Sequence, residues 1–447
     1  MKTITIIGSG YVGVSTAALA ANAGYKVYLV DVNPKRIDVI KQGRSFFFEE
    51  GIDPLIKKAV DACLLIPTLE YEPAISESSV IFSCVGTPDN PDGSPNLEYI
   101  YASAAKTAET IRPGSVYVQK STVPVGTGAK VSQLLPKDVS YVSNPEFLRE
   151  ACAVRDSIMF DRIVVGGDNR QAIEKVFEIY KAIEKNGMQI ARLAKIDLPT
   201  SAKSGKYMST TLESAELIKV TANAFLALKI SFANSIAKLA DASGADVVGV
   251  MDGIGEDMRI GRAFLNAGRG YGGGCFPKDV SGLISSASDY GVELPIMVSA
   301  QDTNESMPGY IVEKAHEKLG SSLKDLRVAV LGLAFKAGTS DARKSQAVKI
   351  ANLMDKAGAK IVAYDPQAAE EAKEELRRNV VTETNIEAAL KGVQVIFLAT
   401  EWPEIIQFDY VGFTDKNSSV KLVVDCMNCL PEDVIKRLGN KYVGVGR

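Results

Sequence analysis

Histidine is almost absent from this chain: among 447 residues, His316 is the only one. It lies in residues 310–319, which have helical apolar spacing and many charges, so we interpret it as a solvated residue on a charged helix face. Serine-hydrolase triads and dehydrogenation through a histidine base both need an imidazole as general base. The scarcity of histidine therefore excludes both kinds of chemistry.

The chain also lacks basic runs and long apolar runs. Its 51 Lys and Arg residues against 54 Asp and Glu residues give a net charge of −3, which argues against nucleic acid as a partner and favours small-molecule ligands. Met1 leads into the apolar residues 4–7 without a charged leader or a cleavage site, and no run of 18 apolar residues follows. We therefore predict a cytoplasmic protein that is neither secreted nor inserted into a membrane.

Cysteine is too sparse and too scattered for a disulfide framework. In a long chain without a leader we expect the cysteines to be reduced. Cys426 and Cys429 have the spacing of half a zinc or redox site, but neither a second pair nor a nearby histidine completes it. We interpret this pair as structural and predict no metal site. The six cysteines lie at positions 63, 84, 152, 275, 426 and 429.

The N-terminal residues show the order strand, glycine turn, helix, strand that is typical of a dinucleotide-binding fold. Residues 8–13, Gly-Ser-Gly-Tyr-Val-Gly, form the turn, and such glycines allow a tight bend, backbone approach to a pyrophosphate and close helix packing. Asp31 ends the second strand, where a carboxylate suits a ribose 2′-OH and repels a 2′-phosphate. We therefore predict NAD as the cofactor, while Lys35 and Arg36 just beyond leave NADP open.

Three further loops follow strand-like runs in the same half of the chain. Thr87 lies in a Val-Gly-Thr-Pro loop and Thr122 in a Ser-Thr-Val-Pro loop, where doubly wound sheets bind ligands at the carboxyl ends of their strands. The alternative is that both threonines are ordinary turn formers. The third loop contains Glu146 and Glu150, which are either site residues or a charge pair at the start of a helix.

Residues 214–240 predict one long helix in the middle of the chain. Lys219 and Asn223 are four residues apart and so share a face. A neighbouring apolar stripe contains Ala222, Leu226 and Ile230. The helix is more than twice the average length, which favours a bridge between domains or a dimer interface. A lysine on a helix is usually solvated, so Lys219 has a function only if a ligand lies beside it.

A second nucleotide-type fold is predicted near the C-terminus. Residues 358–365 align without gaps on residues 24–31, and each segment is a helix stop followed by a strand that ends in Asp. The second copy replaces the glycine turn with a longer loop at residues 335–345, so it should bind a different, nucleotide-bearing ligand.

The predicted fold class is α/β, with two Rossmann-like doubly wound domains joined by a long central helix. A chain of 447 residues is too long for one core. Polar connectors place the boundaries near residues 200 and 320. The predicted domains are therefore 1–200, 201–320 and 321–447.

Cys275 lies in a glycine-rich segment, residues 268–279 (Gly-Arg-Gly-Tyr-Gly-Gly-Gly-Cys-Phe-Pro-Lys-Asp). The glycines leave the backbone open to a bulky ligand, and Lys278 and Asp279 place a charge and a potential base beside the sulfur. A nucleophilic thiol next to a nicotinamide predicts oxidation through a covalent thioester. The alternative is a surface turn with a buried, inert cysteine.

The chain resembles the UDP-glucose/GDP-mannose dehydrogenase family over essentially its whole length. It departs from the family pattern at Gly274, where Ser is usual, at Ser235, where Glu is common, and at Gln346, where Pro is common. These departures bear on the choice of sugar and leave the chemistry unchanged. The Cys-Phe-Pro-Lys-Asp stretch is similar to the glucose-specific branch. The motifs that carry the resemblance occur at 8–13, 85–88, 121–126, 144–150, 215–219 with Asn223, 259–261, 270–279, and 332–336 with Asp341 and Arg343.

The resemblance implies a four-electron oxidation of UDP-glucose to UDP-glucuronate by two molecules of NAD, with UDP-N-acetylmannosamine or GDP-mannose as alternative substrates. Cys275 would capture the aldehyde as a thiohemiacetal and carry the thioester. Either Glu150 or Asp279 would activate the water that hydrolyses it. The implied catalytic residues are Cys275, Lys219, Asn223, Asp279, Glu150 and Thr122.

The resemblance also implies the binding residues, the domain roles and the assembly. The domains would bind NAD, form a central dimerisation region with the cysteine loop, and bind the UDP-sugar, in that order. The chain would be a homodimer with shared active sites, in which Arg259 reaches the partner's substrate. The implied NAD contacts are Gly8, Gly10, Tyr11, Val12, Gly13, Asp31, Arg36, Thr87, Thr122, Glu150, Lys278 and Arg343. The implied UDP-sugar contacts are Glu146, Phe147, Leu148, Arg149, Lys219, Asn223, Arg259, Phe264, Leu265, Tyr271, Gly272, Phe335 and Lys336.

Two other functions would account for part of these residues. A β-hydroxyacid dehydrogenase shares the N-terminal fold and a Lys-x-x-x-Asn helix, but it stops after one hydride and needs neither Cys275 nor a second nucleotide fold. A non-catalytic nucleotide-sugar sensor has little reason to retain Cys275, Lys219 and Asp279 together.

Overall fold

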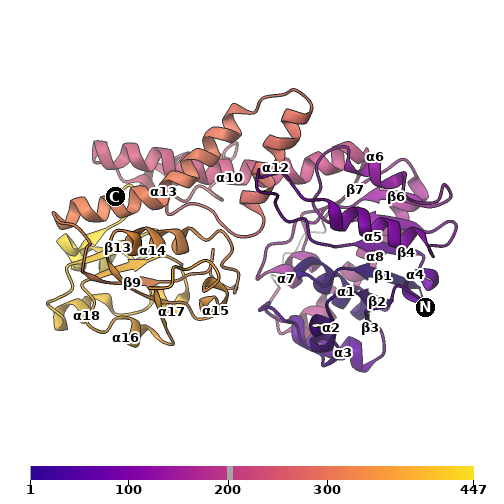
Figure 1. Cartoon of the computed structure of the whole chain (residues 1–447), viewed down its shortest axis with the longest axis horizontal. Coiled ribbons are helices and arrows are strands. Elements are labelled where there is room, and N and C mark those ends of the chain that lie inside the picture. Colours follow the sequence, from indigo (N-terminus) through magenta and orange to yellow (C-terminus); the bar gives the residue numbers. More distant parts are fainter. Residues whose placement is uncertain (1, 199–204) are drawn as a thin grey trace. The chain divides into compact units, whose positions relative to one another are not determined.

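A computed structural model describes residues 2–198 and 205–447, and the chain divides into two compact units, Met1–Ala222 and Asn223–Arg447. Each unit contains one largely parallel β-sheet with helices on its faces (Figure 1). The predicted α/β class with two doubly wound sheets is therefore confirmed. The three-part division at residues 200 and 320 stays a prediction.

The first unit is built on an eight-stranded sheet of order β3-β2-β1-β4-β5-β6-β7-β8. All neighbouring strands are parallel except β6 and β7. The order reverses between β1 and β4, which is the point where sheets of this type bind their ligands. The strands are β1 (Thr3–Ile7), β2 (Lys26–Val30), β3 (Leu65–Thr68), β4 (Val80–Ser83), β5 (Val116–Gln119), β6 (Ser140–Ser143), β7 (Arg162–Gly166) and β8 (Lys206–Thr210).

Apolar residues on both faces of this sheet are covered by helices. Ile4 and Ile6 of β1 belong to one core, while Ile7 belongs to another on the opposite face. Figure 1 shows α5 and α6 over one side and α1, α3 and α7 over the other. The helices are α1 (Tyr11–Asn22), α2 (Pro34–Lys41), α3 (Ile52–Asp61), α4 (Ala74–Glu77), α5 (Glu98–Ala108), α6 (Thr127–Ser132), α7 (Ala153–Ile158), α8 (Arg170–Lys185), α9 (Gly187–Ala194) and the start of α10 (Leu212–Ser243).

The second unit has a six-stranded parallel sheet of order β11-β10-β9-β12-β13-β14. Its core includes Ala233, Ala237 and Ala240 of α10. The strands are β9 (Arg327–Leu331), β10 (Lys360–Tyr364), β11 (Val381–Glu383), β12 (Val395–Leu398), β13 (Leu422–Asp425) and β14 (Tyr442–Val443). The helices are α11 (Val247–Gly255), α12 (Phe276–Asp289), α13 (Pro295–Leu319), α14 (Gln346–Lys356), α15 (Ala369–Ala372), α16 (Ile386–Ala389), α17 (Pro403–Ile406), α18 (Tyr410–Lys416), α19 (Glu432–Leu438) and the 3-10 helix η1 (Gly439–Lys441).

The internal repeat expected from the sequence is present in the backbone. Gly24 and Gly358 both adopt left-handed conformations, with φ of +98° and +91°. Each precedes a strand that pairs in parallel with the first strand of its sheet. Asp31 and Asp365 follow these strands directly, so the two folds share a helix stop, a strand and a terminal carboxylate.

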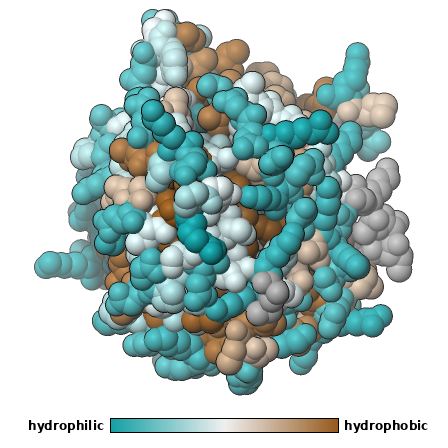
Figure 2. Space-filling model, turned by 90° about the vertical axis from the view of Figure 1, so that its right-hand side faces the viewer, coloured by the Kyte–Doolittle hydropathy of each residue, from teal (hydrophilic) through white to brown (hydrophobic). Residues whose placement is uncertain are grey.

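Helix α10 has 32 residues and is slightly longer than predicted. By length and composition alone it could cross a membrane, and 44% of its most apolar 18-residue window is buried inside the structure. The window contains Lys, Asn and Ser among its apolar residues, and the core helix of a water-soluble protein meets the same test. On the face drawn in Figure 2, hydrophilic residues predominate and apolar residues lie among them in small areas.

The loop with Cys426 and Cys429 is held by hydrogen bonds. Asp425 accepts bonds from the backbone N–H groups of Met427, Cys429 and Leu430, and from the Cys429 thiol. Burial raises the pKa of both thiols. The two cysteines are therefore neutral at physiological pH, as expected for structural residues.

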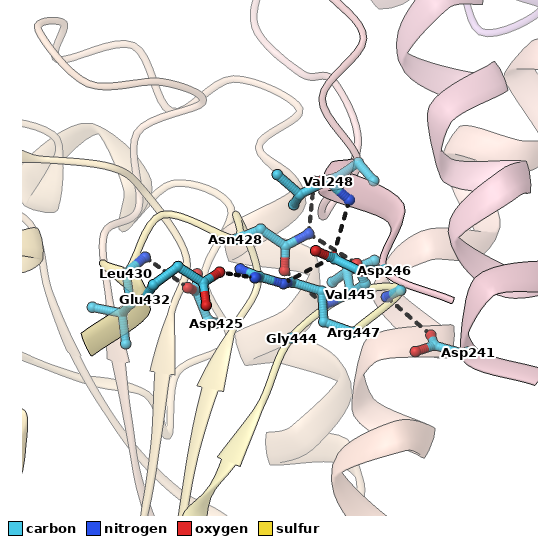
Figure 3. Close-up of polar contacts among 12 residues, drawn as sticks. Asp241, Asp246, Val248, Asp425, Asn428, Leu430, Glu432, Gly444, Val445 and Arg447 are labelled. Atoms are coloured by element: carbon cyan, nitrogen blue, oxygen red, sulfur yellow. Dashed lines mark hydrogen bonds and ion pairs between the residues drawn. The ribbon is translucent and has the colours of Figure 1, made fainter. Parts of the chain in front are cut away.

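Hydrogen bonds and ion pairs of the C-terminal residues connect this loop to helices of the second unit (Figure 3). Asn428 donates to Val445 O (2.8 Å) and accepts from Val445 N (2.9 Å). Arg447 pairs with Glu432 and lies 3.1 Å from Asp246 at the N-cap of α11. The end of the chain thus joins β13, α11 and α19.

His316 on α13 is half-buried, and its Nε2 is buried without a hydrogen-bond partner among the described residues. The interpretation as a solvated residue was therefore wrong. Its neighbours Val312 and Ala315 pack into the core of the second unit, which draws one edge of the imidazole out of water.

Candidate active site

The turn from β1 to α1 has the shape that a pyrophosphate requires. A Cβ on Gly8 (φ +97°) would lie 2.6 Å from Cys84 O, and one on Gly13 would lie 1.8 Å from Gly8 O, so both positions need glycine. Gly10 caps α1, and no atom of the described residues lies within 4 Å of its Cβ position. Open space therefore lies at the helix N-terminus, where N–H groups favour an anion. Tyr11 and Val12 form the first turn of α1.

Asp31 lies at the end of β2, as predicted, but it also bonds within the protein. One carboxylate oxygen accepts from Ser9 N and Ser9 Oγ, both at 2.6 Å, and the other accepts from Asn33 N at 2.8 Å. The carboxylate is thus fixed beside the glycine turn. Nearby, the exposed Arg36 places its guanidinium 4.7 Å from the ring centroid of Phe46.

The loops after β4 and β5 are joined to each other. Ser121 Oγ donates to Val85 O at 2.7 Å, which ties the loop of Thr122 to that of Thr87. Thr87 is buried and Thr122 is half-buried. Both threonines lie beyond the carboxyl ends of neighbouring strands on the ligand side of the switch point, as the sequence predicts.

Glu146 forms a buried ion pair with Lys219. Their charged atoms are 2.9 Å apart, and the two side chains are only 9% and 5% exposed. Burial would raise the pKa of Glu146, but Lys219, Lys120 and the N–H of Leu148 outweigh it, so that the pKa is lowered overall. The expectation that Lys219, as a lysine on a helix, is solvated is therefore wrong.

The segment around this pair does not begin a helix, because the next helix, α7, starts at Ala153. Glu150 is half-buried in the turn before it. The Arg162 guanidinium lies 3.9 Å, and Lys219 Nζ 5.5 Å, from the centroid of the Phe147 ring. Arg149 bonds to Asp156 and is largely exposed.

Lys120 belongs to the same buried network, although the sequence gave no reason to select it. It is 4% exposed and donates to Tyr180 OH at 2.7 Å; Tyr180 OH in turn donates to Asn144 Oδ1 at 2.6 Å. The sequence feature that could have identified Lys120 is its position as a lysine at the end of a predicted core strand.

In the second unit Cys275 is exposed and caps the N-terminus of the 14-residue helix α12. The alternative of a buried, inert cysteine is therefore wrong, and the helix end favours negative charge on the sulfur. One turn along, the buried Asp279 accepts from Asn223 Nδ2 at 2.6 Å and lies 2.9 Å from Lys278 Nζ. Asn223, Lys278 and Asp279 are thus brought together near Cys275.

The glycines before Cys275 let the loop after β9 approach closely. A Cβ on Gly272 would lie 2.6 Å from Lys344 O, and one on Gly273 3.0 Å from the Phe335 ring. A Cβ on Gly274 would lie 2.6 Å from the Arg343 guanidinium. Gly274, one of the departures from the family pattern, therefore leaves room for Arg343.

Polar side chains hold the same loop in place. Asn304 accepts from Tyr271 N (2.7 Å) and donates to Tyr271 O (3.0 Å), and Gln346 also donates to Tyr271 O (3.0 Å). Arg269 is fully buried and donates to Phe335 O at 2.8 Å and Ala334 O at 3.1 Å. We did not predict these roles for Asn304, Gln346 and Arg269, although a charged residue among five glycines is a signal in itself.

The remaining predicted substrate residues differ in burial and in their neighbours. Leu265 is buried in the core, so only its backbone is available to a ligand. Phe264 (φ +65°) faces the Phe276 ring at 6.1 Å, and Lys336 lies 5.6 Å from the Phe335 ring. Arg259 is 86% exposed and bonds to its neighbour Asp257.

Comparison with known proteins gives consistent matches along the chain. Residues 2–184, 213–306 and 329–432 match the NAD binding, central and UDP binding domains of the UDP-glucose/GDP-mannose dehydrogenase family. UDP-glucose 6-dehydrogenase YwqF of Bacillus subtilis is 36% identical over 451 residues, covering 99% of this chain and 97% of that protein. Among solved structures, a UDP-glucose dehydrogenase from Pyrobaculum islandicum is 35% identical with a TM-score of 0.88, covering 100% of this chain and 98% of that one. A UDP-D-ManNAc dehydrogenase from Pyrococcus horikoshii is 26% identical with a TM-score of 0.84, covering 100% and 99%.

Proposed function

Because the chain belongs to the UDP-glucose/GDP-mannose dehydrogenase family, we propose that it oxidises UDP-glucose to UDP-glucuronate, with two molecules of NAD reduced per sugar. The observation that supports this most directly is the exposed Cys275 at the N-terminus of α12, one helical turn before Asp279, which accepts a hydrogen bond from Asn223. A one-step dehydrogenase has no use for such a thiol. Glucose is favoured over N-acetylmannosamine because the relatives named for UDP-glucose are more similar, at 36% and 35% identity against 26%.

The first unit has the residues that NAD would need. The open backbone at Gly10 would accept the pyrophosphate and Asp31 the adenosine ribose. When bound, NAD supplies the hydride acceptor for both oxidation steps.

Thr122 and a water held by Glu150 or Asp279 would form the route by which the proton of the sugar C6 hydroxyl leaves, while the first hydride leaves C6 and an aldehyde results. The Cys275 thiolate would attack the aldehyde carbon to give a thiohemiacetal, which becomes a thioester on loss of a second hydride and, through the same proton route, of its hydroxyl proton. Lys219 and Asn223 would donate to the oxygen that gains charge, a contribution of several kcal/mol in a dry site. Water, activated by Glu150 or Asp279, would then release the carboxylate and the free thiol.

A panel of nucleotide sugars tests the substrate. We expect NADH formation with UDP-glucose at a higher kcat/KM than with UDP-N-acetylmannosamine or GDP-mannose. A higher kcat/KM with either alternative would refute the assignment to glucose and keep the family chemistry.

Asp31→Asn should narrow the preference for NAD over NADP by about tenfold or more, because a carboxylate beside a 2′-phosphate costs up to several kcal/mol. Asparagine keeps the size of the side chain and can still accept from Ser9. The measurement is the ratio of kcat/KM values for the two cofactors, with the exposed Asp38→Ala on α2 as the matched control. Equal efficiency of the wild-type protein with both cofactors would show that Lys35 and Arg36 dominate.

Helix α10 supports the proposal of a homodimer. Large apolar residues on one side of this helix remain exposed in a single chain. They are spaced eight, seven and seven residues apart: Leu217, Phe225, Phe232 and Leu239. A second copy of the chain would bury such a stripe, which is costly in water. We therefore propose that α10 lies in a dimer interface and that Arg259 serves the partner's substrate.

Complementation tests the shared site. Arg259→Ala and Cys275→Ala homodimers should each be nearly inactive. Random exchange between them makes half of the dimers hybrids, each with one intact site, so about a quarter of wild-type activity should return. No recovery despite demonstrated subunit exchange would mean that Arg259 acts within its own chain.

A further inference from the structure

A buried carboxylate on α10 holds the loop that carries Thr122. Glu216 is 2% exposed, and its two oxygens accept hydrogen bonds from Gly126 N (2.8 Å) and Gly128 N (2.7 Å). These N–H groups lie at the start of α6, where no side chain of the helix's own N-cap accepts them. Glu216 therefore caps α6 from an element about 90 residues further along the chain.

The loop backbone is shaped around this carboxylate. Gly126 adopts a left-handed conformation, with φ of +85°. A Cβ on Gly128 would lie 2.9 Å from Glu216 Oε1 and 2.8 Å from the ring of Tyr141. Glycine at these positions is thus what allows the side chain to reach two backbone N–H groups at once.

Thr122 lies between this contact and a second anchor. On its N-terminal side, Ser121 donates through N to Ser83 O (3.2 Å) and through Oγ to Val85 O (2.7 Å). On its C-terminal side, the buried Val123 packs into the core, and the chain then reaches the Glu216 contact. Loss of Glu216 would release one end of the segment and leave the other fixed.

The start of α10 is itself fixed against the sheet. A Cβ on Gly166 of β7 would lie 2.3 Å from Thr211 O and 2.6 Å from the Ala215 side chain, so the helix touches the strand backbone here. Lys219 follows Glu216 by three residues, which places it on a neighbouring part of the same face, and it forms the buried pair with Glu146. One rigid element therefore holds both Lys219 and the Thr122 loop.

We propose that Glu216 is a positioning residue of the reaction, which sets Thr122 relative to Lys219 by fixing residues 121–128 to α10. The proposal rests on the proposed function, because Thr122 and Lys219 have catalytic roles only there. Glu216 acts through the loop backbone and contacts neither the sugar nor the nicotinamide.

Glu216 should also make the loop sensitive to pH. Burial raises the pKa of Glu216 to about 7, and Glu213 on the same helix adds to this, while the N–H groups of Gly126 and Gly128 oppose it. Tyr141 on β6 also faces the carboxyl, but burial raises the pKa of its phenol well above the ordinary value, so it stays neutral. A carboxylate can accept both N–H bonds, whereas a protonated carboxyl gives up acceptor capacity. The two N–H bonds lower the pKa of the buried carboxyl, so their loss, with the side chain still buried, would raise it further. Protonation therefore favours the state without these bonds, and the loop should loosen as the pH falls through about 7.

Steady-state kinetics of E216Q provide the first test, with the exposed Glu213 one turn earlier supplying the matched control, E213Q. Glutamine has one acceptor oxygen and turns an NH2 group toward a backbone N–H. We expect kcat to fall about 10- to 100-fold with a smaller change in KM for UDP-glucose, because small misplacements of reacting groups have effects of this size. In the wild-type protein kcat should rise with pH near 7. This rise should disappear in E216Q and persist in E213Q, moved to slightly lower pH because Glu213 helps to raise the pKa of Glu216. A wild-type kcat and pH profile in E216Q would overturn the proposal.

Hydrogen–deuterium exchange provides a test that does not depend on turnover. A peptide covering residues 121–132 should exchange faster in E216Q than in the wild-type protein or E213Q, and equal exchange would overturn the proposal. If the wild-type protein shows no dehydrogenase activity, the proposed function is refuted. Hydrogen–deuterium exchange would then still decide whether Glu216 holds the loop. If E216Q does not fold, E216D replaces it: aspartate keeps the charge but is too short to reach both N–H groups. Wild-type exchange and kcat in E216D would count equally against the proposal.

Discussion

Cys275→Ala should release no UDP-glucuronate, a loss of about 10³-fold or more, because removal of a covalent nucleophile ends the pathway it carries. In the wild-type protein, two NADH should form for each UDP-glucose consumed. The first hydride leaves C6 of the sugar alcohol; the second leaves the thiohemiacetal carbon and produces the thioester. Without the sulfur, the second oxidation has no covalent intermediate from which to start. NADH absorbance and chromatographic quantification of the uronate, measured on the same sample, give both numbers.

The matched control is Cys63→Ala, since Cys63 is the other exposed cysteine among the described residues and lies in a surface turn. It should keep wild-type stoichiometry. Cys275→Ser adds a second comparison: it should accumulate an ester that hydrolyses slowly, because an alkoxide leaves less readily than a thiolate. Full uronate production by Cys275→Ala would refute the covalent mechanism and leave the family assignment intact.

Local patterns were sufficient to predict both nucleotide folds. The roles of residues 8–13 and Asp31 can be predicted from short-range rules. A tight turn needs glycine, a phosphate site at a helix N-terminus needs an accessible backbone, and the end of a strand places one carboxylate. The same rules applied to residues 358–365 found the second fold without its glycine turn. The long helix followed from spacing alone, and its observed ends differ from the predicted ones by two and three residues, within the usual uncertainty of helix boundaries.

The contacts that hold the loops in place could not be predicted in this way. Glu216 and Gly128 are 88 residues apart, and Arg269 and Phe335 are 66 residues apart. Nothing in the neighbourhood of either side chain identifies its distant partner, because those hydrogen bonds exist only after the sheets have formed. The same is true of Lys219, which looks like a solvated helix lysine until Glu146 is placed beside it.

Lys219→Met should lower both activity and stability by large amounts. Breaking a buried ion pair by removing one partner typically costs about 3–5 kcal/mol, because the other charge is left buried without compensation. Lys120 also lowers the pKa of Glu146, so the observed loss should lie at the lower end of that range. Activity should fall about 10²- to 10³-fold, the usual effect of removing a donor that stabilises developing negative charge. Thermal unfolding and kcat give the two measurements, and Lys238→Met, a cation elsewhere on α10, is the control.

The double variant Lys219→Met with Glu146→Gln separates these two effects. It removes both charges, so stability should return toward the wild-type value, whereas activity should stay low because the donor is still missing. Since the pKa of Glu146 is lowered on folding, the stabilisation from its charge is fully present above the ordinary carboxyl pKa of about 4.3 and is lost as the pH falls through the lower value in the folded state. The difference in free energy of unfolding between the wild-type protein and the double variant should therefore be constant between about pH 6 and 8. Glu216 titrates in this range, but it is present in both proteins and so does not change the difference. Activity recovered along with stability would show that Lys219 acts only by compensating the buried charge of Glu146. Stability recovered alone would assign Lys219 to the chemistry.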